Sequence, residues 1–314
     1  MNFSFKRSLI AATIVTSAMV ASQVTIADVP ESKDPIKIAV NEWTGQHLSA
    51  NITAELLKKK GYNVELVTAG GLSQLTAIAQ GEIHLNPELW DNSITDAYTN
   101  AVASGDILVR GSLGLKPQEG WIYPKYMKEK CPGLPNYQAL YDCAQSFANA
   151  ETYPKGRLIT YPADWGTRSK DVVASIDLPF VAVAGGSEGA MVAELKSALA
   201  AKEPILMMFW QPHWLFAEID VDWVTWNPIE GECVEETQNR NTACGFAQAN
   251  AVKIESKMVA QKWPEASELF KKIKISNEEQ NRMILAVDQK KRPLSEVVDE
   301  WMIQNKSKWS EWVK

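Results

Sequence analysis

Residues 203–214 read EPILMMFWQPHW and contain a short apolar run between Pro204 and Pro212. A run of this length predicts a strand buried on both faces of a sheet. Two tryptophans, Trp210 and Trp214, lie at its end. Open α/β sheets bind ligands beyond the carboxyl ends of their strands, so these aromatics mark a candidate binding site.

Upstream of this strand, apolar runs alternate with amphipathic stretches. Strands are predicted at 35–43, 63–69 and 83–90, and helices at 45–62 and 72–83, with Gly61 at a helix C-cap. This β-α-β-α-β order predicts an α/β fold with a parallel sheet flanked by helices.

The alternation stops at a proline-rich insertion over 116–156 and then resumes. Strands are predicted at 157–165, 180–185 and 204–210, and helices at 168–176 and 187–202. After 221–228 we expect a cysteine-containing loop and then helices to the end. We predict two lobes around a ligand cleft: 28–117 begins the first lobe, 118–213 forms the second, and 214–314 returns to the first.

Residues 1–27 have the pattern of a cleavable secretory signal. Lys6 and Arg7 precede an apolar segment, and Ala27 suits a cleavage site. The apolar segment is interrupted by Thr and Ser and is short for a membrane span. We therefore expect an exported, periplasmic protein that is not membrane-anchored.

The formal net charge is −6, and loss of the signal would make it more negative by two. An acidic surface argues against nucleic acid and anionic membranes as partners. We expect a monomer.

Four cysteines form two local pairs in polar loops: Cys131 with Cys143, and Cys233 with Cys244. In an exported protein this spacing favours two loop disulfides. A zinc site is the alternative, but neither pair has CxxC spacing.

The sequence GGSEG at 185–189 matches a nucleophile elbow, so an exported serine hydrolase using Ser187 is one alternative. Only His213 follows it, and the intervening residues leave little room for an acid and a base. An N-cap role for Ser187 is the favoured interpretation, and no catalytic residue is predicted.

Metal-binding signals are weak. The three histidines, His47, His84 and His213, lack ligand spacing, and no resident cofactor is predicted. The acidic loop from Glu230 to Glu236 offers oxygen ligands for calcium, with a solvated loop as the alternative.

Five of the twelve tryptophans fall near predicted strand ends or the crossover between lobes. They are Trp43, Trp90, Trp121, Trp165 and Trp210. The other seven are assigned to packing. Indole faces bind quaternary ammonium groups, which need no hydrogen-bond acceptor. A sugar also stacks on tryptophan but needs more polar neighbours than are found here, so a methylated amine is favoured over a sugar-binding module.

Several motifs together resemble the periplasmic substrate-binding proteins of ABC importers for glycine betaine, choline and related methylamines. They include NEWTGQH, ELWDN, EGWIYPKY, YPADWGTRS and MMFWQPHW. The sequence is most similar to the trimethylamine N-oxide (TMAO)-binding branch. The resemblance implies a type II periplasmic binding protein fold, with a permease and an ATPase as partners.

The resemblance also implies that Trp43, Trp90 and Trp210 are walls of an aromatic cage, completed by Trp121 or Trp165. Glu88 lies two residues before Trp90, so both side chains share one face of the strand. We expect Glu88 near the polar end of the substrate, with a surface or lobe-closing carboxylate as the alternative. TMAO is the favoured ligand; glycine betaine, choline, carnitine and dimethylsulfoniopropionate remain alternatives.

Overall fold

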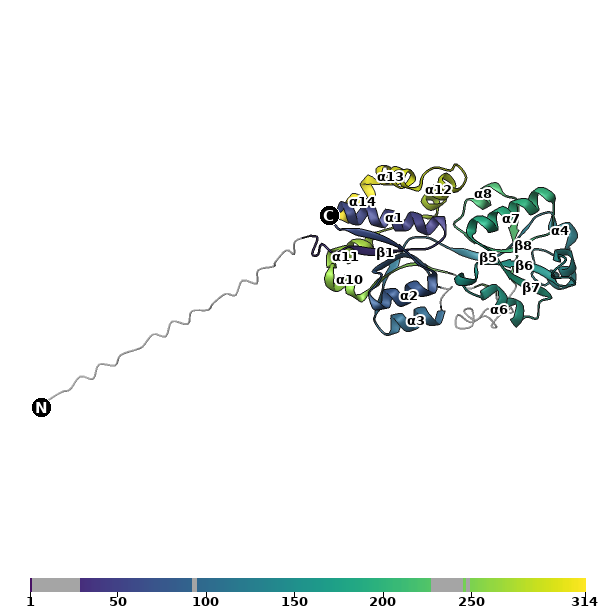
Figure 1. Cartoon of the computed structure of the whole chain (residues 1–314), viewed down its shortest axis with the longest axis horizontal. Coiled ribbons are helices and arrows are strands. Elements are labelled where there is room, and N and C mark those ends of the chain that lie inside the picture. Colours follow the sequence, from purple (N-terminus) through teal and green to yellow (C-terminus); the bar gives the residue numbers. More distant parts are fainter. Residues whose placement is uncertain (2–28, 92–94, 227–244, 247–248) are drawn as a thin grey trace.

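The computed structural model describes Met1 and residues 29–91, 95–226, 245–246 and 249–314. It contains two five-stranded sheets with helices packed around each, and these form two lobes side by side (Figure 1). We call the lobe with strand order β2-β1-β3-β10-β4 the first lobe, and the lobe with order β7-β6-β8-β5-β9 the second lobe. The predicted α/β fold of two lobes is confirmed.

The first lobe takes residues from both ends of the described chain. Its strands are β1 (Ile36–Val40), β2 (Val64–Thr68), β3 (Leu85–Trp90), β4 (Ile107–Ser112) and β10 (Ala251–Ser256). Its helices are α1 (Thr44–Lys59), α2 (Gly71–Gln80), α3 (Thr95–Ala103), α10 (Lys257–Lys262), α11 (Pro264–Lys272), α12 (Asn277–Asp288), α13 (Leu294–Gln304) and α14 (Lys306–Val313).

The second lobe is built from the middle of the chain. Its strands are β5 (Gln118–Pro124), β6 (Gly156–Thr160), β7 (Phe180–Ala184), β8 (Leu206–Gln211) and β9 (Val221–Trp223). Its helical segments are α4 (Met127–Lys130), α5 (Ala139–Cys143), η1 (Ala144–Phe147), η2 (Ala163–Trp165), α6 (Arg168–Ser175), α7 (Glu188–Ala201) and α8 (Leu215–Glu218). The boundaries between lobes at 117 and 213 stay predictions.

Both sheets are mixed. The strands of the predicted β-α-β units are parallel as expected, β1 with β2 and β3, and β6 with β7 and β8, but each sheet also contains an antiparallel strand that was not expected. β10 is antiparallel to β3 and β4, and β5 is antiparallel to β8 and β9. β5 and β10 are the first strands that the chain forms after it crosses from one lobe to the other. Each runs antiparallel to the strands of the β-α-β units in its sheet. The sequence pattern predicts an insertion where β5 lies and a loop followed by helices where β10 lies, because pairing between distant segments leaves no local pattern.

β8, the strand within residues 203–214, is buried from Leu206 to Trp210 as predicted. It lies inside the second sheet, between β6 and β5. α7, which precedes it, begins after Ser187, whose side chain accepts a hydrogen bond from the Ala190 backbone N–H at 3.3 Å. The predicted N-cap role of Ser187 is therefore confirmed.

A buried lysine joins β10 to the end of α11. Lys253 is fully buried, and its Nζ donates to the carbonyl oxygens of Lys271 and Ile273 at 2.6 and 2.8 Å. Burial lowers the pKa of Lys253 to about 7, with further lowering by the charges of Lys274 and Arg110. The last carbonyls of a helix have no partner within it, and Lys253 supplies one.

Cys131 and Cys143 form a disulfide, as predicted for the first local pair. Cys233 and Cys244 lie outside the described residues, as does the acidic loop from Glu230 to Glu236. Within the described segments, no helix has the length and apolar character needed to cross a membrane.

Candidate ligand-binding site

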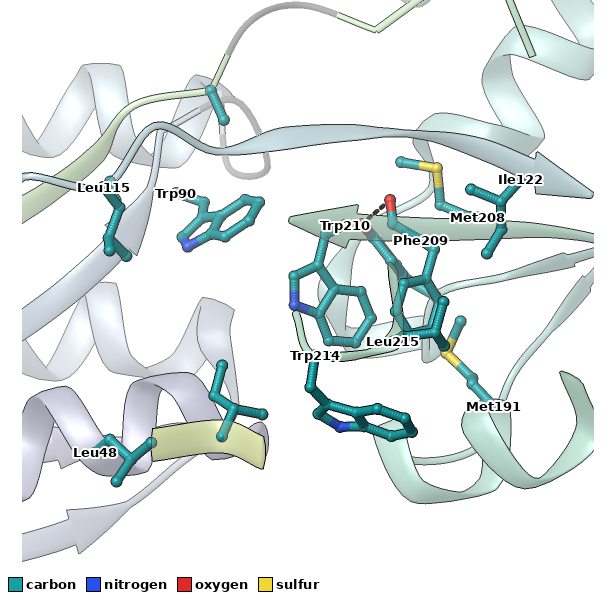
Figure 2. Packing of buried hydrophobic residues seen from close by; sticks show 14 of the residues in the cluster. Leu48, Trp90, Leu115, Ile122, Met191, Met208, Phe209, Trp210, Trp214 and Leu215 are labelled. Carbon is teal, nitrogen blue, oxygen red and sulfur yellow. Dashed lines mark hydrogen bonds between the residues drawn. The ribbon is translucent and has the colours of Figure 1, made fainter. Parts of the chain in front are cut away.

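A cavity of about 90 Å³ lies between the two lobes and is walled by aromatic rings. Trp43 and Trp90 reach it from the first lobe, and Trp165, Trp210 and Tyr161 from the second. Figure 2 shows Trp90, on β3, facing across the gap toward Trp210 on β8. The structure therefore brings four of the five tryptophans singled out in the sequence to one place.

The local fold explains these positions. Trp90 is the last residue of β3, and Trp210 is the last but one of β8. Trp43 is the N-cap of α1, three residues after β1 ends. Trp165 ends a short 3₁₀ turn after β6. All four lie at or just beyond strand ends, where α/β sheets place ligand contacts.

The rings of the second lobe hold one another by edge-to-face packing. The Trp165 and Trp210 centroids are 5.6 Å apart at 70°, and Tyr161 lies 5.6 Å from Trp210. Phe209 stacks on Trp210 at 4.5 Å from behind. Across the gap, Trp43 meets Trp165 at 5.1 Å and 67°. These are favourable geometries for aromatic pairs, so the rings stabilise one another in the walls of the cavity.

The indoles of the first lobe are held by a buried carboxylate. Trp43 Nε1 and Trp90 Nε1 both donate to Glu88 Oε1, at 3.4 and 3.1 Å. Ser49 Oγ and Gln280 Nε2 donate to Glu88 Oε2, each at 2.7 Å. Burial raises the pKa of Glu88, and these four hydrogen bonds oppose the rise.

Glu88 therefore lies behind the indoles and is not among the residues that line the cavity. The predicted shared face of Glu88 and Trp90 agrees with the hydrogen bond between them. The carboxylates that line the cavity are instead Glu42, Asp164 and Glu119, and sequence reasoning missed Glu119, which lies on β5. Glu119 pairs in register with Trp210 on β8, so the two side chains lie on one face of the sheet.

The side chain of Glu119 is 2% exposed and forms an ion pair with Arg168, at the start of α6. It also lies beside Tyr161, whose hydroxyl donates to the Phe209 carbonyl at 3.2 Å. Burial and the Glu119 charge raise the pKa of Tyr161 well above its usual value. The Tyr161 hydroxyl is therefore neutral and the wall carries a carboxylate balanced by a guanidinium.

Trp121 lies elsewhere. It is fully buried in β5, its Nε1 donates to Ser169 Oγ at 3.0 Å, and it packs against Trp226 and Phe246 at 5.1 and 5.8 Å. Trp121 lies two residues after Glu119 and so shares its face of β5, but it pairs with Met208, farther from the strand end that carries Trp210. Of the two tryptophans proposed to complete the cage, the structure brings only Trp165 to the cavity.

Polar groups line the remaining surface. The N-terminus of α2 contributes Gly70 and Gly71, and Asp164 faces them from the second lobe, 3.6 Å from where a Cβ on Gly70 would lie. Asn86 donates to Gln74 at 2.9 Å on the floor of the cavity. The first backbone N–H groups of a helix lack internal partners and favour negative atoms of a ligand.

A two-lobed α/β structure with an aromatic cavity between the lobes is typical of proteins that bind small ligands between domains. The chain belongs to the OpuAC family, described as the substrate-binding domain of the ABC-type glycine betaine transport system, whose model matches residues 34–304. The protein is thus a substrate-binding component of ABC transport and not an enzyme, as predicted.

Relatives support this assignment. The chain is 26% identical over 309 residues to the trimethylamine N-oxide-binding protein of Pelagibacter ubique (strain HTCC1062), covering 95% of this chain and 98% of the relative. Its fold matches lactococcal OpuAC complexed with glycine betaine, with a TM-score of 0.72, 18% identity, and 90% and 100% of the two chains covered. It also matches an ABC-transporter choline-binding protein in complex with choline, with a TM-score of 0.74, 14% identity, and 90% and 93% covered.

Proposed function

We propose that the protein is an exported receptor that binds a small methylated amine in this cavity, with TMAO as the leading ligand, and delivers it to an ABC permease and its ATPase. The observation that carries the proposal is the convergence of four indoles from both lobes on one cavity. The export signal predicted over residues 1–27 supports a periplasmic location.

Indole faces suit a methylated cation for a physical reason. Each face contributes about 0.5–2 kcal/mol to binding a quaternary ammonium, and the cation has no N–H that needs an acceptor. Four faces together approach the ~8 kcal/mol that micromolar binding requires. Two further carboxylates at the cavity, Glu42 and Asp164, add an electrostatic preference for positive charge.

The same carboxylates favour TMAO over ligands that carry a carboxylate of their own. Glycine betaine, carnitine and dimethylsulfoniopropionate would each bring a full negative charge beside Glu42 or Asp164. The N-oxide oxygen is a single compact acceptor, and the N-terminus of α2 at Gly70 and Gly71 offers it backbone donors. Choline lacks the negative group and is expected to rank second.

A ligand panel tests the proposal. Calorimetry or tryptophan fluorescence with TMAO, choline, glycine betaine, carnitine and dimethylsulfoniopropionate should show tight binding of TMAO and weaker binding of the three carboxylates. The proposal of a methylamine receptor fails if none of the five binds below millimolar concentration. A stronger response to glycine betaine than to TMAO would contradict the choice of ligand only.

A further inference from the structure

A second cluster joins the two lobes beside the aromatic cavity. Glu188, at the start of α7, and His213 and Trp214, after β8, belong to the second lobe. Thr44, at the start of α1, and Asp288, at the end of α12, belong to the first. In Figure 2, Trp214 lies below Trp210 of the cage, and the His213 ring packs against both tryptophans at 5.4 and 5.2 Å.

Hydrogen bonds across the gap connect these residues. The Thr44 backbone N–H donates to Glu188 Oε2 at 3.0 Å, and the Thr44 hydroxyl is 2.7 Å from Asp288 Oδ1. Trp214 Nε1 donates to Asp288 Oδ2 at 3.3 Å. A carboxylate of one lobe therefore caps the helix that begins directly after Trp43 of the other lobe.

His213 is neutral in this arrangement. The Leu215 backbone N–H donates to His213 Nδ1 at 3.2 Å, so Nδ1 is an acceptor and the ring proton lies on Nε2. Nε2 in turn donates to Glu188 Oε1 at 3.0 Å. A metal ligated by Nε2 would need the proton on Nδ1, against the Leu215 N–H, so the tautomer argues against a metal at this cluster.

Two carboxylates thus meet with a neutral imidazole between them. The ligating atoms of Glu188, His213 and Asp288 lie within 4.8 Å of one another. The nearby cation, Lys196, donates to Gln289 Oε1 at 3.2 Å and lies over the Trp214 ring at 4.8 Å. Among the described residues, no ion pair to Asp288 is formed. Two like charges in a buried interface repel, and a proton would relieve the repulsion.

The partners decide which carboxylate can hold that proton. Both oxygens of Glu188 accept from N–H groups, of Thr44 and His213, that cannot reverse their direction. Asp288 has one such donor, Trp214 Nε1, while its other oxygen faces a hydroxyl. A hydroxyl both donates and accepts, so a protonated Asp288 can donate to Thr44 Oγ1 with every bond kept.

We propose that closure of the two lobes takes up a proton, which Asp288 holds against the Thr44 hydroxyl. The link to ligand affinity rests on the proposed receptor function, because a closing receptor binds ligand between its lobes. Glu188 is then a positioning residue that joins the lobes at the start of α1, and Asp288 is the group whose charge closure must remove.

The direction of the pKa of Asp288 agrees with this assignment. Burial raises it first and the Glu188 charge raises it further, while the hydrogen bond from Thr44, charge on the His213 ring and the hydrogen bond from Trp214 oppose the rise. A group whose pKa is higher in the closed state stabilises that state below its open-state pKa. This stabilisation is lost as the pH rises through the closed-state pKa, so affinity should fall as the pH rises.

Calorimetry of TMAO binding, repeated in buffers of different ionisation enthalpy, counts the protons taken up on closure. The wild type should take up a fraction of a proton that approaches one where Asp288 is ionised in the open state and protonated in the closed state. Asp288→Asn, which imitates the protonated side chain, should take up none through this site. Its affinity should stay near the low-pH value of the wild type between about pH 5.5 and about pH 8.

Glu188→Gln is the matched control. Its amide N–H₂ must face either Thr44 N–H or His213 Nε2–H, both donors, so this variant should bind more weakly at every pH. Thr44→Val should weaken the pH response and Thr44→Ser should restore it. Proton uptake by Asp288→Asn equal to that of the wild type, or none by the wild type, overturns the proposal.

The proton uptake by Asp288 on lobe closure, which we call the latch, can be tested without ligand. X-ray scattering of the ligand-free wild type should show a smaller radius of gyration at acidic pH, and Asp288→Asn should be compact throughout. If no methylamine binds but this difference is seen, the receptor assignment fails and the latch stands. If ligand binds and the scattering of both proteins responds equally to pH, the latch fails.

Discussion

The two walls of the cavity present the same side chain but are held by different forces. In the first lobe, Trp43 and Trp90 are fixed through their N–H groups to one carboxylate oxygen of Glu88. In the second lobe, Trp165 and Trp210 are fixed through their faces, by Tyr161 and by each other. A hydrogen-bonded wall depends on single atoms, whereas a packed wall depends on shape and shared contact area.

The largest effect is expected when the anchor of the first wall is removed. Glu88→Leu keeps the volume but leaves the Trp43 and Trp90 N–H groups without their acceptor, at about 1–3 kcal/mol each, so binding should fall by about 100-fold. Ser49 and Gln280 keep the Gly45 carbonyl as an acceptor. Glu88→Gln retains an oxygen for both indoles and should lose much less. Calorimetry, with thermal unfolding to establish folding, measures both. Equal affinities for the Leu and Gln variants would show that the anchor is not needed.

Loss of one ring from the packed wall should cost less. Trp210→Ala removes a face worth about 0.5–2 kcal/mol, which corresponds to roughly 2- to 30-fold in affinity. Trp210→Phe should recover part of the loss. Trp309→Ala is the control, because Trp309 donates to the Met302 carbonyl far from the cavity. A similar loss of affinity in both Ala variants would argue against the cage.

A smaller effect is expected when the packed wall loses only a polar atom. Tyr161→Phe keeps the ring against Trp165 and Trp210 and removes the hydroxyl that donates to Phe209. The cost should be about 1 kcal/mol or less, a few-fold in affinity, with no change in the order of the ligand panel. A loss as large as that of Glu88→Leu would mean that the second wall is also held by hydrogen bonds.

The smallest effect on affinity is expected at Trp121. Trp121→Phe removes the Nε1 bond to Ser169 and some packing against Trp226, so the free energy of unfolding should fall by about 1–2 kcal/mol. The affinity for TMAO should not change. Denaturant unfolding and calorimetry on the same sample separate the two quantities; an affinity loss with unchanged stability would return Trp121 to the cage.

Local patterns predicted the β-α units well, and with them the positions of Trp43, Trp90 and Trp210. These residues end or follow strands whose apolar runs are visible in the sequence. Glu119 is not predictable in this way, because β5 follows a proline and its sequence has the pattern of an insertion. Its neighbour in the sheet, Trp210, lies far along the chain, and antiparallel pairing at that distance has no sequence period.

The role of Glu88 shows a different limit. Strand alternation correctly indicated that Glu88 and Trp90 share a face, but not which of them is nearer the cavity. That order depends on Ser49 and Gln280, which approach Glu88 from α1 and α12. A carboxylate beside tryptophans in a sequence is equally compatible with contacting the ligand and with holding the rings.

The position of β10 has a consequence for the order in which the protein folds. β10 lies between β3 and β4 and pairs with both, yet it is made only after the whole second lobe. A nascent chain that ends before residue 251 has β3 and β4 with no strand to join them. The second lobe can complete its sheet as soon as β9 emerges, whereas the first must wait with open strand edges. We therefore expect chains truncated before β10 to retain a folded second lobe and to aggregate through the first.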